Sequence, residues 1–445
     1  MNRPDLYIKY RYVIRIPKDK SELFIFGVSV GFIALKSMVP FLYGVQLLFL
    51  LYMGIHGWKK RGKLFTNMYT ITYALFLIWC ALSSYWAPAT NQAINTTISV
   101  GQMIIICSLL IIYLDRFENI EKTIKGFAIA SIIMLVYLFL KTPMSEWRYA
   151  LYGSFSASTD EGRIGYSIGF HPNAMGNLCA MLIFIWVYLY DISKKKIHLF
   201  WILLLSIVLL FTKSRASILM VLLEVSGYIY LCKKRKYGII KILPMLAIVS
   251  VILYWAIFHI PILYHLIGFR MEGLLGIFGA SGSGDASAYT RLNMMKYGMD
   301  MFKKNPISGV GFGNYGYYAY RYYGLFAQTY AHSNYIELLA DLGIIGSILY
   351  YIIPVYCCVH LGLHLRSVME SERKLCAFLF VNIFVRLLMD TVKITYDDEL
   401  AQMLNVICYC GMILLCGKNK CKKNRNTRNH NGDGDNEFKT ISEQN

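Results

Sequence analysis

Two short polar segments of the chain carry residue types suited to chemistry on a phosphorylated substrate. Thr212-Lys213-Ser214-Arg215 separates two apolar runs, and Ala331-His332-Ser333-Asn334-Tyr335 precedes another. A guanidinium group binds diphosphate oxygens through a planar fork of donors, and an imidazole near a helix N-terminus stays neutral and can accept a proton. Arg163 and Arg291 lie in the two longest loops and are candidate companions of Arg215. Three arginines that converge on one cavity would bind a lipid diphosphate.

Both segments also have a purely structural interpretation. Arg215 can extend its long side chain to lipid phosphate. Ser333 or Asn334 can cap the helix that follows, with His332 as an ordinary interface residue. An arginine inside a bilayer helix costs about 2.5 to 3.5 kcal/mol on insertion scales, so Arg215 requires a partner in either interpretation.

The elements that must position these residues are membrane-spanning helices. Of the 445 residues, 56% are hydrophobic and only 16% are charged, which excludes an ordinary soluble protein. A helical span needs roughly 20 apolar residues, and continuous apolar runs exclude the alternating pattern of a β-barrel. We therefore expect an all-α polytopic membrane protein with about twelve helices, near residues 22–40, 41–57, 67–87, 96–114, 125–141, 173–190, 198–212, 216–231, 239–259, 335–358, 375–392 and 400–416.

The basic residues predict the orientation of these helices, because short cytoplasmic loops retain positive charge. Basic clusters occur in loops that lie on the same side of the membrane, after the second, sixth and eighth expected spans: Lys59-Lys60-Arg61, Lys194-Lys195-Lys196 and Lys233-Lys234-Arg235-Lys236. Both termini are then cytoplasmic: residues 1–21, and a basic, disordered tail over 417–445 that follows the membrane domain of residues 22–416. The net charge of +19 is then an orientation signal and an attraction to anionic lipid, not evidence of nucleic-acid binding.

Two outer loops, 142–172 and 260–334, are long enough to build a site. The second lies between the ninth and tenth expected spans, and its sequence predicts a helix from Ala286 to Lys304, ended by Asn305-Pro306. A glycine-rich turn over 309–315 resembles a dinucleotide fingerprint only superficially, because its spacing is wrong and no βαβ unit surrounds it. We therefore expect no nucleotide and no other cofactor.

A further group of ionisable residues lies within or beside the expected spans. Arg386 and Asp390 are four residues apart and can pair on one helical face, whereas Glu224 has no local partner. The run Asp397-Asp398-Glu399 is a rival metal site, but we interpret it as acidic residues at a helix start. Because the two long outer loops contain no Asp-x-Asp or His/Asp cluster, we predict chemistry that does not depend on a metal.

Four motifs occur in an order that resembles the O-antigen polymerase and O-antigen ligase family. The motifs are Gly162-Arg163 with His171-Pro172-Asn173-Ala174-Met175-Gly176, then Thr212-Lys213-Ser214-Arg215-Ala216-Ser217, then 305–314 (NPISGVGFGN), then 331–346, which begins AHSNYIELL. They span residues 162–346, and the remainder of the chain resembles the family only in hydropathy.

The resemblance implies an all-helical membrane glycosyltransferase that acts at the outer face of the bacterial cytoplasmic membrane on glycans carried by undecaprenyl diphosphate. By motif, Arg215, Arg291 and His332 take the catalytic roles. Substrate contacts fall to Arg163, Asn173, Lys213, Asn334 and Tyr335. The family's usual partners are a flippase and a chain-length regulator.

Three functions remain open at the level of sequence. The first is a polymerase that joins lipid-linked repeat units into O-antigen, capsule or exopolysaccharide. The second is a ligase that transfers finished glycan to a lipid or protein acceptor. The third, from another class, is a lipid-glycan flippase or other transporter, although the chain shows no internal repeat of the kind many transporters have.

Overall fold

A computed structural model describes residues 51, 67–152, 162–165, 168–268 and 286–432, and within these ranges the chain is helical and forms no strand. The helices are α4 (Met68–Ser83), α5 (Thr90–Tyr113), α6 (Phe117–Lys141), α7 (Met144–Tyr152), α8 (Pro172–Ser193), α9 (Ile197–Phe211), α10 (Arg215–His259), α11 (Pro261–Leu263), a π-helical turn (Tyr264–Gly268), α13 (Ala286–Lys304), α14 (Tyr315–Tyr323), α15 (Asn334–His364), α16 (Glu370–Met389) and α17 (Glu399–Gly432). The spans expected at 22–40 and 41–57 lie outside the described residues.

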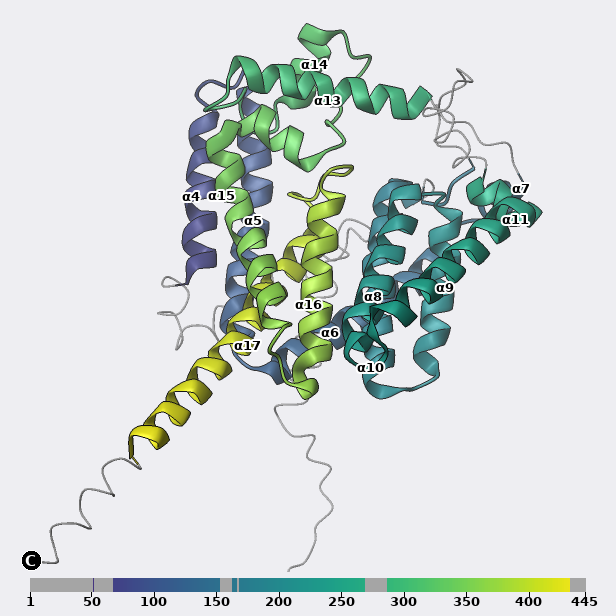
Figure 1. Ribbon diagram of the computed structural model, residues 1–445. Coiled ribbons are helices and arrows are strands. Elements are labelled where there is room, and N and C mark those ends of the chain that lie inside the picture. Colours follow the sequence, from purple (N-terminus) through teal and green to yellow (C-terminus); the bar gives the residue numbers. More distant parts are fainter. Residues whose placement is uncertain (1–50, 52–66, 153–161, 166–167, 269–285, 433–445) are drawn as a thin grey trace, which may run out of the picture.

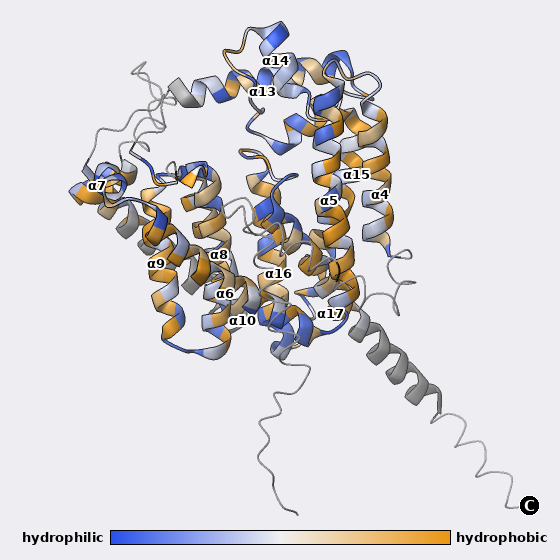
Figure 2. Ribbon diagram, turned by 180° about the vertical axis from the view of Figure 1, so that it is seen from behind, coloured by the Kyte–Doolittle hydropathy of each residue, from blue (hydrophilic) through white to orange (hydrophobic). Residues whose placement is uncertain are grey.

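The composition of the helices confirms a multi-pass membrane protein. Within the described part of the chain, six helices are long and apolar enough to cross a bilayer, and α4 and α9 are shorter apolar helices. Apolar residues cover most of the helical surfaces, whereas polar residues gather at the end of the molecule that carries α13 and α14 (Figure 2). Figure 1 shows α13 lying across that end, above α4, α5 and α15.

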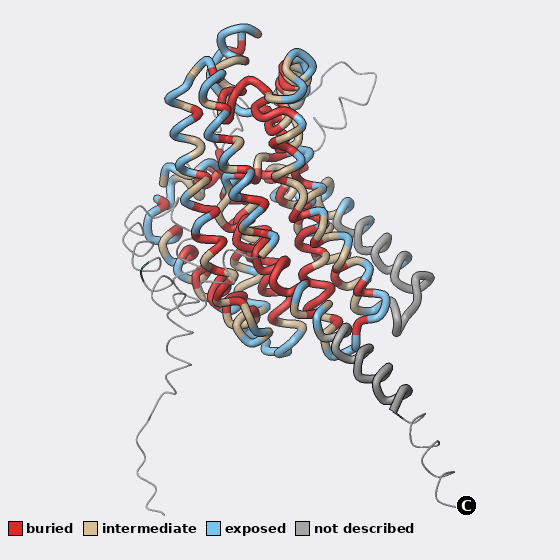
Figure 3. Tube along the Cα trace, turned by 90° about the vertical axis from the view of Figure 1, so that its left-hand side faces the viewer, coloured by how far each residue is buried: buried red, intermediate tan, exposed pale blue. Residues whose placement is uncertain are grey.

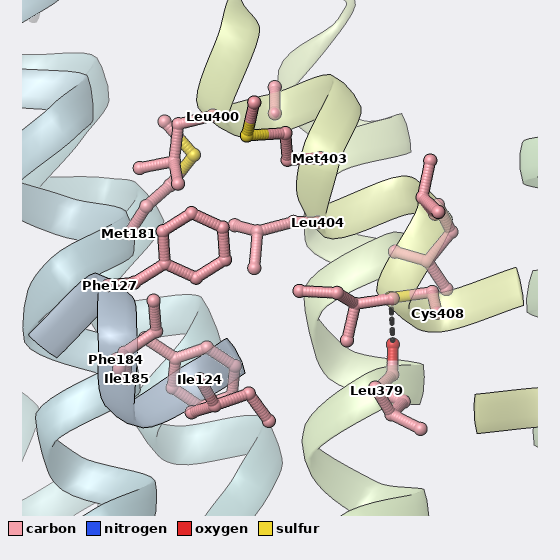
Figure 4. Close-up of a cluster of buried hydrophobic side chains, with 14 of the residues drawn as sticks. Ile124, Phe127, Met181, Phe184, Ile185, Leu379, Leu400, Met403, Leu404 and Cys408 are labelled. Atoms are coloured by element: carbon pink, nitrogen blue, oxygen red, sulfur yellow. Dashed lines mark hydrogen bonds between the residues drawn. The ribbon is translucent and has the colours of Figure 1, made fainter. Parts of the chain in front are cut away.

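The helices form two packed groups. One contains α4, α5, α15 and α17 and the other contains α8, α9 and α10, while α16 contacts α10, α15 and α17 between them. Buried residues follow the inner faces of the helices (Figure 3). Side chains of α6, α8, α16 and α17, among them Phe127, Phe184, Leu379 and Leu404, meet in a core that joins the two groups (Figure 4). Because lipid tails are as apolar as these residues, close packing holds the helices together.

One expectation about the helices is wrong. The spans predicted at 216–231 and 239–259 form a single helix of 45 residues, α10, which continues through Lys233 and the basic residues after it. Lysine and arginine are good helix formers, and no Asn, Asp or Pro separates the two apolar runs before Pro244. Positive charge marks the side of the membrane but does not end a helix. The helix α17 likewise extends to Gly432, into the tail for which the sequence favours disorder.

The helix predicted over 286–304 is confirmed as α13. The glycine-rich segment after it packs against a kink in α15 at Gly343, where φ is 64°. The amides of Val310 and Gly311 donate to the carbonyls of Ala340 and Asp341, at 2.9 and 2.8 Å. A Cβ atom on Gly343 would lie 2.3 Å from the Ile307 carbonyl oxygen, so this crossing requires glycine.

The same segment fixes the start of α5. Asp341 accepts hydrogen bonds from the amides of Gly313 and Tyr315, both at 2.7 Å, and the Asn314 carboxamide oxygen accepts from the Ala89 amide at 2.8 Å. The Phe312 amide donates to the Ser83 hydroxyl at 2.9 Å. The end of α4, the start of α5 and the part of α15 at Asp341 are therefore held together through one loop.

Candidate functional site

A cavity of about 910 Å³ lies among elements that are distant in sequence. Its wall is formed by the first turns of α5, α8 and α10, by the side of α13 that carries Arg291, and by two connecting segments, 328–332 before α15 and 392–399 before α17. Among the residues predicted from the sequence, Asn173, Arg215, Arg291 and His332 line this cavity. Four separate segments therefore bring the candidate side chains to one place.

Arg215 is the first residue of α10 and reaches the cavity through a tight turn after α9. The preceding Lys213 has a left-handed backbone (φ 50°), is buried at 1% exposure and does not line the cavity. Helix α8 packs closely on this turn at Gly176, where a Cβ atom would lie 2.9 Å from the Thr212 hydroxyl oxygen. The turn aims Arg215, and not Lys213, into the cavity.

Arg163 contacts the turn that carries Arg215, but it does not line the cavity. Its side chain is buried, its Nε donates to the Thr212 carbonyl at 2.7 Å, and its guanidinium also donates to the carboxamide oxygen of Asn173. Arg163 thus joins the start of α8 to the turn that carries Arg215. Its geometry is that of a positioning residue.

His332 lies against the cationic side of the cavity. Its backbone is left-handed (φ 58°), and its ring packs on Tyr330 with 4.3 Å between centroids. Burial lowers the pKa of His332, and together with the neighbouring Arg291 and His171 it brings this pKa to about 3. The imidazole is therefore neutral near pH 7, so it can accept a hydrogen bond but is a weak base.

Asn334 binds the segment that precedes α17, and Tyr335 binds α16. The Asn334 carboxamide oxygen accepts from the amides of Thr395 and Tyr396 at 2.9 and 3.0 Å, and the Tyr335 hydroxyl donates to the Leu387 carbonyl at 2.9 Å. Neither residue lines the cavity. Asn334 holds the 392–399 segment in place, whereas Tyr335 joins the start of α15 to α16.

Arg386 and Asp390 form the ion pair predicted from their spacing. Through Thr395 they also contact the 392–399 segment. The guanidinium of Arg386 lies 4.0 Å from the Asp390 carboxylate, which also accepts from the Thr395 hydroxyl at 2.6 Å. Both side chains are buried, where a charge requires a partner.

The comparison with known families agrees with this geometry. Residues 199–351 match the family model described as O-antigen ligase. Residues 199–351 are therefore similar to the O-antigen ligase family. The match covers α10, α13, α14 and the first part of α15, and it includes Arg215, Arg291 and His332. It confirms the resemblance to the O-antigen polymerase and ligase family. No curated protein matches the chain.

Outside the matched segment, the structure adds His171 to the site. His171 lines the cavity and caps α8, because its Nδ1 accepts a hydrogen bond from the Asn173 amide at 3.1 Å. The opposite nitrogen, Nε2, is then the donor in the neutral ring. Its position directly before Pro172 was the available signal, since a residue before a proline at a helix start often serves as the cap.

The segment before α17 contributes Lys393, which sequence reasoning missed. Its buried side chain lines the cavity, and its Nζ lies 3.5 Å from the Met220 sulfur. Burial lowers the pKa of Lys393, whereas the carboxylates of Asp398, Asp390 and Glu224 raise it. Glu224 is fully buried, and its carboxylate forms no hydrogen bond within the described residues, so Lys393 is the charged neighbour that the sequence did not reveal.

Asp397 also lines the cavity, opposite in charge to the arginines. Its side chain is exposed to the cavity, but the surrounding protein and the adjacent Asp398 carboxylate raise its pKa to about 6. Glu337 connects it with the histidine segment, because this carboxylate accepts from the Ala331 amide at 2.7 Å and from the Tyr396 hydroxyl at 3.2 Å. The residues next to His332 and next to Asp397 are therefore bound to one side chain.

Asp398 and Glu399 fit the interpretation as acidic residues at a helix start. Glu399 is the first residue of α17, and Asp398 accepts from the Ala401 amide at 3.0 Å. Asp397 lies outside that role. Within the described residues, no three His, Cys, Asp or Glu side chains gather in a way that could hold a metal ion.

Proposed function

We propose that this protein is a polysaccharide polymerase that joins oligosaccharide repeat units carried on undecaprenyl diphosphate at the outer face of the cytoplasmic membrane. The observation that carries the proposal is the cavity that gathers Arg215, Arg291 and His332 from three separate segments. The similarity to the O-antigen ligase family supports glycosyl transfer in general. The polymer would be O-antigen, capsule or exopolysaccharide, and a flippase and a chain-length regulator would act beside the enzyme.

The cationic side of the cavity suits the donor diphosphate. Arg215 and Arg291 would bind the oxygens of the leaving group and stabilise the charge that develops as the bond from phosphate to the anomeric carbon breaks. His171 would donate a further hydrogen bond from Nε2, and the start of α8 would add its positive dipole. Diphosphate is a good leaving group, so the reaction requires no general acid and, we propose, no metal.

The acidic side of the cavity suits the acceptor hydroxyl. The hydroxyl oxygen attacks the anomeric carbon while its proton passes to a base, and the polyprenyl diphosphate leaves with the electron pair. Asp397, with a pKa of about 6, is a better proton acceptor at neutral pH than His332, whose pKa is about 3. We therefore assign the base to Asp397 and the orientation of the hydroxyl to His332. Direct displacement inverts the anomeric configuration.

The first experiment measures the length of lipid-linked glycan in cells that lack this protein, complemented with wild type or His332→Ala. We expect single repeat units to accumulate without the protein, and His332→Ala to restore long chains at less than about one-tenth of the wild-type level, because the hydroxyl is no longer oriented. Equal membrane levels of the two proteins are the control. Normal chain lengths with His332→Ala would contradict the assignment.

The same cells separate the alternatives. The family model is described as a ligase, and this favours a ligase as the second candidate. A ligase predicts that long lipid-linked polymer persists in the deletion strain but never reaches its final acceptor. A flippase predicts that repeat units remain in the inner leaflet, which a leaflet-selective labelling reagent would detect.

Asn334→Ala tests whether Asn334 positions the 392–399 segment, which carries Lys393 and Asp397. Loss of its carboxamide oxygen leaves two buried amides without an acceptor, at a cost of about 1–3 kcal/mol for each group, and displaces Lys393 and Asp397. We expect kcat to fall about tenfold while the affinity for the lipid diphosphate donor changes less than about twofold, because Asn334 does not line the cavity. A loss of donor affinity as large as that of Arg215→Ala would show instead that Asn334 contacts the donor.

A further inference from the structure

One wall of the cavity is a polar face in the first turns of α5. Gln92, Asn95, Thr96 and Ser99 all line the cavity and recur at spacings of three, one and three residues along α5. Such spacing places side chains on one face of an α-helix. The helix α5 is long and apolar enough to cross a bilayer, and most of its polar residues gather in its first turns.

The side chains of this polar face form few hydrogen bonds within the described part of the protein. The Thr96 hydroxyl donates to the Gln92 carbonyl at 2.9 Å within the helix, but the side chains of Gln92, Asn95 and Ser99 form no hydrogen bond within the described residues. Asn95 and Ser99 are exposed and Gln92 is half-buried, so their polar groups are accessible from the cavity. Their position on the cavity wall means that their partner is whatever fills the cavity.

The chemistry of this face differs from that of the rest of the wall. It carries carboxamides and hydroxyls but no charge, whereas other parts of the wall carry Arg215 and Arg291. A carboxamide offers donors and an acceptor together, and a hydroxyl offers both. Sugar hydroxyls also donate and accept, so they match this face, whereas a phosphate matches the arginines.

The face is also held firmly in place. Gly313 packs directly on Thr96, where a Cβ atom would lie 2.5 Å from the Thr96 hydroxyl oxygen. Asn314 fixes the backbone at Ala89, and Asp341 fixes Gly313 to α15. A binding surface that is ordered before its ligand arrives loses less entropy on binding.

We propose that the polar face of α5, formed by Gln92, Asn95, Thr96 and Ser99, is a subsite that binds the hydroxyls of a sugar ring beside the reacting carbon. The inference rests on the proposed glycosyl transfer and identifies where the glycan, as distinct from the diphosphate, is bound. The ring belongs either to the donor glycan or to the acceptor glycan, which share this chemistry.

The test compares Asn95→Ala/Ser99→Ala with wild type in nanodiscs. Asn91→Ala is the matched control, because Asn91 is an exposed amide on the same helix that does not line the cavity. The probes are bare undecaprenyl diphosphate and lipid-linked repeat units extracted from cells that lack this protein. We expect the double variant to bind the bare lipid within about twofold of wild type, since no cation is removed.

The two sources of the sugar give different outcomes. If the donor ring occupies the subsite, the double variant binds the glycosylated lipid about tenfold more weakly, as one or two lost hydrogen bonds predict. If the acceptor ring occupies it, donor affinity is unchanged and KM for the acceptor rises about tenfold. Wild-type affinity and wild-type KM for both substrates would overturn the subsite. Failure of the proposed function looks different, because the wild-type protein would then bind neither lipid and Arg215→Ala would change nothing.

Discussion

Arg215→Ala is expected to reduce the rate of glycan transfer by roughly 10²- to 10³-fold, the cost of removing one donor that stabilises charge in a transition state. Arg215 is the first residue of α10 and lines the cavity together with Arg291. Its charge is permanent, and its planar fork matches two diphosphate oxygens at once. The measurement is transfer by purified protein in nanodiscs with lipid-linked repeat units as donor.

Two variants isolate the cause of that loss. Arg215→Lys keeps the charge but not the fork, so we expect activity between wild type and Arg215→Ala. Arg321→Ala removes an exposed arginine of α14 that does not line the cavity, so it should transfer glycan at the wild-type rate. If Arg215 only anchored α10 to lipid phosphate, Arg215→Ala would lower thermal stability and leave kcat/KM of the folded protein unchanged.

The sequence predicted the helices well because apolar length is a strong local signal. The described spans lie where continuous apolar runs place them, and Ala286–Lys304 was recognised from the Asn305-Pro306 pair that ends it. The break expected within α10 was wrong for a related reason. Basic residues report the side of the membrane, and this property is independent of whether the backbone stays helical.

The sequence predicted the residues of the site less well than it predicted the helices. Arg215, Arg291, His332 and Asn173 line the cavity, and each was found by residue type and motif. Asn334 belongs to the same motif as His332, but its carboxamide binds the backbone near Thr395. A motif records residues that a site requires and does not distinguish those that touch the substrate from those that hold the wall.

The segment before α17 is the part of the cavity wall that the sequence predicted least well, because Asp397 was considered only as a metal site or helix start and Lys393 was missed. Lys393 and Asp397 follow the eleventh expected span by a few residues, and nothing local indicates that they meet the arginines. Their placement depends on contacts over long separations, such as those from Glu337 to Tyr396 and from Asn334 to the same segment. Such contacts are a property of the fold, because they join segments that no sequence periodicity connects.

Asp397→Asn is expected to lower kcat/KM by roughly 10²- to 10⁴-fold, the usual contribution of a general base. The pKa of Asp397 is raised to about 6 by the surrounding protein and by Asp398, so the carboxylate is protonated as the pH falls through about 6 and the wild-type rate falls with it. His332 has a pKa of about 3 and contributes no such change between pH 5 and 8. The profile of kcat/KM against pH in wild type should therefore show one acidic limb near pH 6, absent from Asp397→Asn.

Asp398→Asn distinguishes this explanation from a general effect of charge in the cavity. An asparagine still accepts the hydrogen bond that Asp398 receives from the Ala401 amide, so the start of α17 is retained. Loss of the negative charge beside Asp397 stabilises its ionised form, and the acidic limb should move to lower pH while the rate at its plateau stays close to wild type. A limb that stays near pH 6 in both variants would instead assign the titration to another group, and Asp397 would then serve the cavity only through its charge.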